Sequence, residues 1–338
     1  MPAVKTSDFS YDLPEEAIAQ SAVEPRDSAR LLDTRDLTDH TFRELPDLLE
    51  PGDLVVVNRT RVSPMRLEGR REPSGGRIEA LLLRSAADGS WEAIMRPTRR
   101  LHDGDRLAFG DTVVALRGDP VEGCGVLVPV VGSLEGAMAR VGSLPLPPYF
   151  HGELADYERY QTVYGTSPGS AAAPTAGLHF TPELIAALGA RGVSVASVDL
   201  KVGLDTFRPI SVELVADHDI HSEDIEVPEE TVAAVSAASR KGGRVVAIGT
   251  TTVRALESAA ARGALGRFNG STDLFIQPGY GFRVVDLLVT NFHVPASTLI
   301  VLVSAFMGEA WRAAYEAALT RGYRFLSFGD AMLAQRRR

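Results

Sequence analysis

Two histidines that could transfer protons stand immediately before segments typical of helix starts. His179 belongs to "PTAGLHFTPELIAAL", in which Thr181 is expected to cap a helix and Pro182 to fill its first position. His293 belongs to "VVDLLVTNFHVPASTL", in which an apolar run delivers Asn291 and the histidine just before a proline. Imidazole changes charge near neutral pH, so both histidines are candidate acid–base groups. A plain turn before a capped helix, or a histidine buried for structural reasons, is the alternative interpretation.

A third segment in which an apolar run leads into a helix start contains several hydroxyl groups. In "RVVAIGTTTVRALES" an apolar run leads into Gly249 and three threonines, and Arg254 follows inside the expected helix. Capping a helix requires one hydroxyl, and three in a row lower helix propensity, so the run indicates a use beyond capping. The segment is not a P-loop, because it lacks the lysine and the glycine spacing of that motif. In "PTAGLH", Gly177 would permit a positive φ or a close approach of another part of the chain.

The acidic segment "DHDIHSED", residues 217–224, is a weaker candidate. His218, His221 and Glu223 could be metal ligands, but their spacing matches none of the HExxH-type motifs. The single cysteine, Cys124, excludes a cysteine-cluster metal site and an intrachain disulfide. We therefore expect no metal. A carboxylate and a histidine beside a reactive centre, or a solvated acidic loop, are the remaining interpretations.

The spacing of the apolar runs predicts two kinds of structure. Residues 62–146 show short apolar runs with turn signals every 8 to 12 residues or so, which is typical of a small β-barrel or sandwich. From about residue 180, helical and strand patterns alternate, which predicts a largely parallel sheet with helices on its faces. The apolar run in "PGDLVVVNRT", just before the first of these regions, is expected to join that sheet.

The fold class expected is therefore α/β, with a mainly parallel sheet flanked by helices and an inserted small β-barrel domain. Residues 1–61 and 147–338 would form the α/β catalytic domain, and residues 62–146 the barrel. Ligands of such sheets bind at the carboxyl ends of strands, beside helix N-termini, so a polar pocket is expected there. No serine–histidine–aspartate order, G-x-S-x-G or G-x-G-x-x-G pattern is present. The residues alone thus indicate a pocket without specifying its reaction.

Composition favours a soluble cytoplasmic protein with an uneven distribution of charge. The 338 residues carry a net charge of −9, which by itself argues against a nucleic-acid partner. Residues 59–106, however, hold eleven arginines against seven carboxylates, whereas residues 211–239 hold eight carboxylates and no lysine or arginine. A polyanion would suit the basic region, and ordinary solvated faces are the alternative. The N-terminus lacks the apolar run of a signal peptide, and "LIVLVSAFM" is too short to span a bilayer, so no membrane partner is expected.

Long segments of the chain, in order and over essentially its whole length, are similar to those of one enzyme family. They include "AAPTAGLHF", "GTTTVRALES", "VVDLLVTNFHVPASTLIVLVSAF", "YRFLSFGDAM", "PGDLVVVNRTRVSPMRL", "LPLPPY" and "YERYQTVYG". With these segments the chain resembles the S-adenosylmethionine:tRNA ribosyltransferase-isomerases of queuosine biosynthesis. Motifs of this length make chance similarity negligible. The resemblance implies the same α/β domain with an inserted barrel.

The resemblance also implies a reaction. The ribosyl moiety of S-adenosylmethionine would be transferred to 7-aminomethyl-7-deazaguanine in tRNA and isomerised, giving epoxyqueuosine-tRNA with release of adenine and methionine. S-adenosylmethionine would be a cosubstrate, and no prosthetic group is implied. The partner would be the anticodon stem-loop of a tRNA with a 7-deazaguanine wobble base, which the basic region could contact. We expect a monomer.

Candidate roles follow from the matching positions. A base must remove a proton made acidic by the sulfonium, and an acid must protonate the departing adenine. The candidates for these two roles are His179, His293 and Glu223. The residues expected to position the cosubstrate are Thr175, Gly177, Thr250, Thr251 and Asn291, with Arg254 on the methionine carboxylate. The residues expected near the base or the phosphates of the tRNA are Asn58, Arg59, Arg61, Tyr160, Gln161 and Tyr164.

Several residues depart from the family's usual pattern. Lys201 replaces a histidine, Asp205 a glycine, Gln277 an aromatic residue and Ala296 a charged residue. The chain thus loses basic and stacking groups and gains an acid. Such changes are expected if the polyanionic substrate were different. They are also expected from divergence without functional change. The alternatives to the family reaction are therefore a paralogue that uses S-adenosylmethionine with a non-tRNA acceptor, and a non-catalytic tRNA-binding protein.

Overall fold

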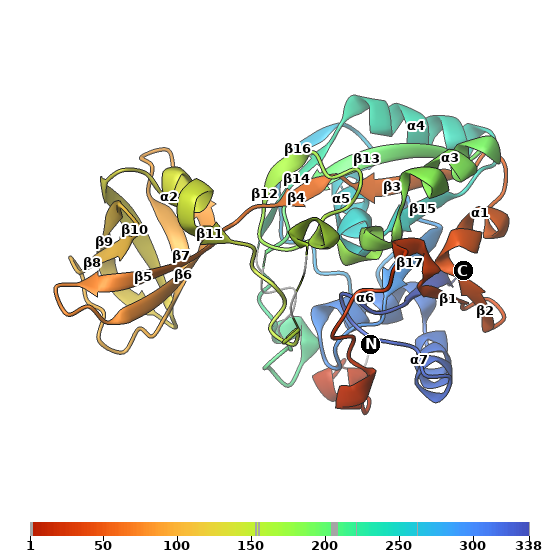
Figure 1. Cartoon of the computed structure of the whole chain (residues 1–338). Coiled ribbons are helices and arrows are strands. Elements are labelled where there is room, and N and C mark those ends of the chain that lie inside the picture. The colour runs from red at the N-terminus through yellow and green to blue at the C-terminus, as the bar shows by residue number, and fades with distance from the viewer. Residues whose placement is uncertain are drawn as a thin grey trace. The chain divides into compact units, whose positions relative to one another are not determined.

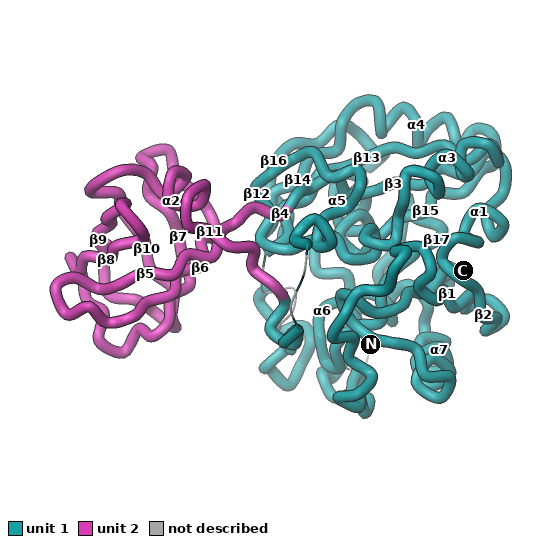
Figure 2. Tube along the Cα trace, in the orientation of Figure 1, with its two compact units in different colours: residues 1–61, 147–338 teal, residues 62–146 magenta. Residues whose placement is uncertain are grey.

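The computed structural model describes residues 3–152, 154, 156–203, 209–220, 222–261 and 263–337 (Figure 1). The chain divides into two compact units (Figure 2). Residues 1–61 and 147–338 form the larger unit, and residues 62–146 form the smaller one. Each unit is described by itself below.

A nine-stranded sheet is the centre of the larger unit. Its strands, in spatial order, are β16 (Phe268–Thr272), β14 (Glu223–Val227), β13 (Ser194–Leu200), β3 (Leu54–Asn58), β15 (Val245–Ile248), β17 (Leu287–Asn291), β18 (Ala331–Gln335), β1 (Arg30–Asp33) and β2 (Thr38–Thr41). A separate two-stranded sheet pairs β4 (Thr60–Val62) with β12 (Ser167–Ser170).

The sheet is mixed, which corrects the expectation of a mainly parallel one. β13, β3, β15 and β17 are parallel neighbours, but β14, β16, β18 and β2 each run antiparallel to a neighbour. The parallel strands β3, β15 and β17 are buried on both faces and read as continuous apolar runs, as parallel strands do. The strands nearer the edges are partly exposed, and helix–strand alternation does not reveal their direction.

Alternate residues of the central strands supply two hydrophobic cores, one on each face of the sheet. Leu54 and Val56 of β3 belong to the core shared with α4 (Glu229–Arg240), α5 (Thr250–Ala260), α6 (Thr298–Met307) and α7 (Ala310–Thr320). Val55 and Val57 belong to the core shared with α1 (Leu45–Leu48) and α3 (Pro182–Ala190). None of the helices in the described ranges is both long enough and apolar enough to cross a membrane.

The expected helix boundaries near the pocket are present. Thr181 caps α3 by accepting a hydrogen bond from the amide of Leu184, and Pro182 is its first residue. Gly308, with φ of +64°, ends α6 just before α7 begins. Within "YRFLSF", Leu326 adopts a positive φ of 69°, and the strand that follows this segment, β18, begins only at Ala331.

Short 3-10 helices complete the larger unit. Those in the described residues are η1 (Thr6–Phe9), η2 (Glu15–Ala17), η3 (Arg26–Ser28), η4 (Phe42–Glu44), η5 (Tyr157–Tyr160), η6 (Thr175–His179) and η8 (Val215–Asp217). η6 contains the "TAGLH" segment and leads into the cap of α3.

The smaller unit is a closed antiparallel barrel, as expected. Its strands are β5 (Arg66–Glu72), β6 (Arg77–Ser85), β7 (Trp91–Arg96), β10 (Cys124–Val131), β9 (Thr112–Val121) and β8 (Arg106–Phe109), and pairing of β8 with β5 closes it. β11 (Gly142–Ser143) pairs with β5, and α2 (Leu134–Val141) packs beside them. Gly69 is required where β5 meets β8, because a Cβ there would overlap the carbonyl of Ala108 and the ring of Phe109.

Candidate active site

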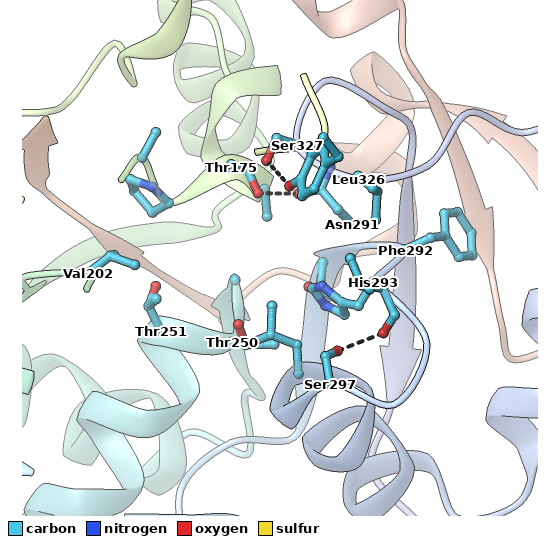
Figure 3. A pocket seen from close by; sticks show the side chains of 18 residues that line it. Thr175, Val202, Thr250, Thr251, Asn291, Phe292, His293, Ser297, Leu326 and Ser327 are labelled. Atoms are coloured by element: carbon cyan, nitrogen blue, oxygen red, sulfur yellow. Dashed lines mark hydrogen bonds between the residues drawn. The ribbon is translucent and has the colours of Figure 1, made fainter. Parts of the chain in front are cut away.

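A pocket in the larger unit lies where β15 and β17 end and α5 and α6 begin (Figure 3). The residues that line it are Tyr149, Ala173, Pro174, Thr175, Ala176, Val202, Gly249, Thr250, Thr251, Thr290, Asn291, Phe292, His293, Val294, Ser297, Leu299, Leu326 and Ser327. The cavity volume is only about 40 Å³, whereas pockets for nucleoside-sized ligands hold roughly 300–1,000 Å³. A ligand of that size therefore requires the pocket to widen.

Polar and apolar side chains share the pocket lining, and no charged side chain is among the lining residues. Hydroxyl groups of threonine, serine and tyrosine, one amide side chain and one imidazole supply the polar side-chain atoms (Figure 3). An uncharged, partly enclosed site of this kind strengthens each hydrogen bond made to a bound ligand.

Asn291, at the end of β17, joins two of the segments around the pocket. Its Oδ1 accepts a hydrogen bond from the Thr175 hydroxyl at 2.8 Å, which holds η6 against the strand end (Figure 3). Its Nδ2 donates to the carbonyl of Asp330 at 3.2 Å, beside the start of β18. Asn291 thereby fixes the position of Thr175 in the pocket wall.

His293 supplies the imidazole of the lining. Its Nε2 lies 2.9 Å from the Thr290 hydroxyl, its amide donates to the Tyr315 hydroxyl, and its carbonyl accepts from the Tyr11 hydroxyl. Burial lowers the pKa of the His293 imidazole to about 3, so the ring is neutral at pH 7. Nδ1 makes no hydrogen bond to any described residue, which leaves one ring nitrogen of a neutral imidazole available to a ligand.

Two residues beside the pocket adopt backbone conformations that non-glycine residues seldom use. Leu326 has φ of +69° and lines the pocket, and Ala296, with φ of +52°, directly precedes the lining residue Ser297. Ser297 caps α6 by accepting from the amide of Ile300. Such strain persists only where surrounding contacts hold it, and it is concentrated at functional sites.

His179, one of the candidate acid–base residues, is not among the residues that line this pocket. Its Nε2 is 2.9 Å from the carbonyl of Gly329, its Nδ1 is 3.3 Å from the carbonyl of Ala176, and its ring packs on Phe42. Burial lowers the pKa of its imidazole. The 3-10 turn of η6 carries the ring into the core beneath the sheet, so Thr175 rather than His179 is the residue of this loop that reaches the pocket.

Glu223 and Arg254 also lie outside the lining, because they bind each other. The carboxylate of Glu223 accepts from the guanidinium of Arg254 through Oε2 and from the amide of Gly203 through Oε1. Arg254 Nε donates to the carbonyl of Leu274. Both side chains are buried, and neither charge is directed at a ligand in the pocket.

Gly177 does not line the pocket either, but a close approach does require glycine there. A Cβ on Gly177 would overlap the Tyr164 hydroxyl and lie 2.9 Å from the Thr162 methyl group. Glycine is required here for the close packing of η6. It is not required for a positive φ, because Gly177 lies within the 3-10 helix.

The residues expected near the base or the tRNA phosphates are not among the pocket lining. Asn58 is fully buried and bonds the backbone of Leu200 and the hydroxyl of the lining residue Thr251. Arg59 is paired with Glu226, and Arg61 with Glu158, at partly exposed positions.

Three neighbouring residues of "YERYQTVYG" are buried or partly buried in the larger unit. Tyr160 is fully buried and packs on Phe328, whereas Tyr164 is partly buried and packs edge-on against Phe180. The carbonyl of the buried Gln161 accepts from Arg26. The Tyr160 ring therefore offers no face for stacking a base.

Sequence reasoning missed Tyr149 and Ser327, which close one side of the pocket. The Tyr149 hydroxyl and Ser327 Oγ are 2.6 Å apart, and burial raises the pKa of the tyrosine well above its usual range. Both residues stand in segments already noted for their similarity, "LPLPPY" and "YRFLSFGDAM". The signal was therefore present, but neither segment showed which of its residues carries a polar function.

The residues that depart from the family pattern lie around the site. Lys201 is exposed beside Gly169, and Gln277 is half-buried with its carbonyl bonded to the amide of Tyr280, so neither lines the pocket. Ala296 adopts the positive φ described above. Asp205 lies outside the described residues.

The metal hypothesis has no support in the described residues, which contain no group of three potential ligands. His218 packs edge-on against Phe275. Glu223 is engaged by Arg254. His221 lies outside the described residues.

A sheet with a neutral, hydroxyl-rich pocket and a buried imidazole at its strand ends defines the class as an α/β enzyme for a small polar ligand. Residues 6–334 match the family model described as "Queuosine biosynthesis protein", and the chain belongs to this family.

Relatives and a solved structure cover nearly the whole chain. The S-adenosylmethionine:tRNA ribosyltransferase-isomerase of Carboxydothermus hydrogenoformans is 49% identical over 98% of this chain and 99% of its own length. That of Symbiobacterium thermophilum is 48% identical with the same coverage. A crystal structure of S-adenosylmethionine tRNA ribosyltransferase from Thermotoga maritima is 38% identical, covers 97% of this chain and 99% of that chain, and has a TM-score of 0.56.

Proposed function

We propose that this protein transfers and isomerises the ribosyl moiety of S-adenosylmethionine onto 7-aminomethyl-7-deazaguanine in tRNA. The products are epoxyqueuosine-tRNA, adenine and methionine. The observation that carries the proposal is the family match over residues 6–334, with relatives named for this activity at nearly half identity over full length. The neutral pocket at the strand ends supports it, because its hydroxyl and amide groups suit a nucleoside.

His293 is the acid–base residue of this proposal. The sulfonium of the cosubstrate acidifies the neighbouring ribose protons, and a neutral imidazole can accept one of them. Burial keeps the ring neutral, so one ring nitrogen is unprotonated at the start of the reaction and can take up that proton. Thr175, Thr250, Thr251 and Asn291 would hold the cosubstrate against that ring through hydroxyl and amide groups.

His179, Glu223 and Arg254 are assigned positioning roles in place of direct ones. His179 links η6 to the Gly329 carbonyl, and the Glu223–Arg254 pair links β14 to α5. Each of these contacts holds an element whose other residues line the pocket. Removing any of the three would displace the lining without deleting a reacting group.

The barrel is the proposed contact for the tRNA backbone. A hollow on it, with a cavity volume of about 760 Å³, is lined by three arginines, Arg70, Arg77 and Arg96. Arg70 and Arg77 lie directly opposite each other on β5 and β6, and neither they nor Arg96 form an ion pair with a described residue.

The same hollow contains two carboxylates, which limit how the anion can bind. Glu79 is paired with Arg66, and Glu68 lies opposite Glu79 in the strand register. Like charges on facing strands destabilise a sheet, so the Arg70–Arg77 pair gains from an anion placed between its guanidinium groups. A phosphate is such an anion. Arg59 and Arg61, partly exposed at the end of β3 and in β4, are proposed as further backbone contacts.

The experiment that tests the function is incubation of the protein with S-adenosylmethionine and tRNA carrying 7-aminomethyl-7-deazaguanine. Adenine is followed by chromatography and the tRNA nucleosides by mass spectrometry. The matched control is the same tRNA with unmodified guanine at the wobble position. The expected result is release of adenine and formation of the epoxide-bearing nucleoside with the modified tRNA. Neither product should form with the unmodified control tRNA.

Two results would overturn the proposal in different ways. Adenine released without any change in the tRNA would indicate another ribosyl acceptor. Binding of S-adenosylmethionine without adenine release, in a folded protein, would indicate a non-catalytic protein. Isothermal titration calorimetry and thermal unfolding supply the two accompanying readouts.

A further inference from the structure

The N-terminus of α5 opens into the pocket without a side-chain cap. Gly249 precedes the helix with φ of +85° and offers no side chain, and Gly249, Thr250 and Thr251 all line the pocket. The backbone amides of Thr250 and Thr251 donate hydrogen bonds to no described residue. The first amides of a helix are strong donors at its positive end, and buried ones normally have a partner.

The hydroxyl of Thr250 is a second, independent group directed at the same place. The Thr250 side chain is 95% buried, lines the pocket, and makes no hydrogen bond within the described part of the chain (Figure 3). Its two neighbours differ, since Thr251 accepts from Asn58 and Thr252 donates to the carbonyl of Ile248. The Thr250 hydroxyl is therefore available to donate to a ligand in the pocket.

Two other helix starts near the pocket have side-chain caps. Ser297 caps α6, which also begins at the pocket, and Thr181 caps α3. α4 and α7 lack such a cap, but their first residues are exposed to solvent, whereas Thr250 and Thr251 are buried. A group that caps α5 from within the pocket has to accept hydrogen bonds.

The chemistry of that group follows from the charges nearby. No charged side chain lines the pocket. Arg254, four residues into α5, binds Glu223 and the carbonyl of Leu274, and its Nη2 has no hydrogen-bond partner among the described residues. Within the lining itself, an anion that enters here is held by the helix N-terminus, where amide donors and the helix dipole favour negative charge. A carboxylate accepts several such bonds at once.

We propose that the carboxylate of the methionine moiety of S-adenosylmethionine binds at the N-terminus of α5. Its donors are the amides of Thr250 and Thr251 and the hydroxyl of Thr250. The inference rests on the proposed function for the identity of the cosubstrate, and it replaces Arg254 as the carboxylate-binding group. The cosubstrate then lies with its methionine end at α5 and its reacting end toward His293.

The test is a comparison of two ligands on four forms of the full chain. Isothermal titration calorimetry measures the affinity for S-adenosylmethionine and for its decarboxylated analogue. Thr250→Val removes the hydroxyl, and Thr250→Pro removes the hydroxyl and the amide at a helix position where proline is tolerated. Thr252→Val is the matched control, because its hydroxyl bonds Ile248 and it does not line the pocket. Thermal unfolding verifies that each variant is folded.

The expected result is a stepwise loss of discrimination between the ligands. The wild-type chain should bind S-adenosylmethionine roughly 10- to 100-fold more tightly than the analogue, the range for hydrogen bonds to a charged group. This ratio should fall in Thr250→Val and approach one in Thr250→Pro, with Thr252→Val unchanged. Affinity for the analogue should stay the same in all four forms.

Three results would overturn the inference. One is equal affinity of the wild-type chain for both ligands, and another is an unchanged ratio in Thr250→Pro. The third is loss of tRNA affinity in Thr250→Pro with the ratio preserved, which would identify the anion as a tRNA phosphate. In all three cases, tRNA-dependent adenine release by the wild-type chain would leave the proposed function intact. Failure of that release would count against the function itself.

Discussion

His293 and His179 occupy different environments although each follows a short polar loop. His293 uses one ring nitrogen for Thr290 and keeps the other within reach of the pocket. His179 faces a backbone carbonyl with each ring nitrogen and lies against Phe42. At the residue scale, we therefore propose proton transfer for His293 and structural support for His179.

His293→Gln should reduce adenine release by roughly 10²- to 10⁴-fold, the usual contribution of a general acid or base. Glutamine retains hydrogen bonding to Thr290 but cannot exchange a proton, so the variant should fold. His179→Gln is the matched control, and this substitution should mainly lower the midpoint of thermal unfolding. Single-turnover adenine release and thermal unfolding measure the two effects. Near-normal release by His293→Gln would rule out the assignment.

The buried imidazole of His293 also predicts how stability depends on pH. The pKa of the ring is about 3 in the folded protein, against 6.5 for an exposed histidine. Between these values the unfolded chain binds a proton that the folded chain does not. The free energy of unfolding should therefore fall as the pH falls through this range, by up to about 1.4 kcal/mol per pH unit.

Urea unfolding of the wild-type chain and of His293→Gln, at several pH values between 7 and about 4, measures this contribution. The difference in the free energy of unfolding between the two proteins should shrink as the pH falls. Only the wild-type chain has a His293 that takes up a proton on unfolding. His179, whose pKa burial also lowers, is present in both and cancels. Parallel curves would mean that the His293 ring is not held neutral.

At the scale of elements, η6 depends on a glycine at its centre. Gly177 lets the hydroxyl of Tyr164 lie against the backbone of η6, and this contact places Thr175 beside Asn291. A helix or strand propensity does not require glycine at this position. The requirement comes from the tyrosine that η6 packs against.

Gly177→Ala should lower the free energy of unfolding by about 1–3 kcal/mol, the usual cost of an extra buried methyl group. Gly189→Ala, in the exposed part of α3 with no atom near its Cβ position, should instead raise it by about 0.5–1 kcal/mol. Chemical denaturation measures both. The double variant Gly177→Ala with Tyr164→Phe should recover part of the loss. No recovery would mean that the hydroxyl is not the obstacle.

At the scale of the whole molecule, charge separates along the chain. The chain as a whole is acidic, with a net charge of −9, whereas residues 59–106 carry a net positive charge. A net negative protein can bind a polyanion when its arginines are gathered on one surface. The hollow on the barrel gathers Arg70, Arg77 and Arg96 in this way.

Arg77→Ser should weaken tRNA binding and reduce the slope of log affinity against log salt concentration by about one, since one phosphate contact is lost. Arg117→Ser is the matched control on the same barrel, because Arg117 is exposed but already paired with Asp88. Filter binding across a salt series measures both variants. Equal slopes for Arg77→Ser and the wild-type chain would exclude the hollow as a phosphate site.

Local pattern was sufficient for the features that depend on near neighbours in the chain. The cap of α3, the barrel and the α/β class follow from periodicity and turn residues. The Ser297 cap of α6 was not expected from the sequence. The polar pocket at the strand ends also followed, because parallel strands bring their carboxyl ends to one edge. The alternation of helices and strands did not reveal that β14, β16 and β18 run antiparallel to their neighbours.

The sequence by itself determined the family and the segments that form the site, since these depend on long runs of residues in order. Only the tertiary structure decided which side chain of each segment reaches the pocket. Thr175 and His179 are four residues apart, yet the 3-10 turn directs one to the pocket and the other to the core. Arg254 is absent from the lining because Glu223 binds it from another strand. Such partners are distant in sequence, so composition and spacing carry no record of them.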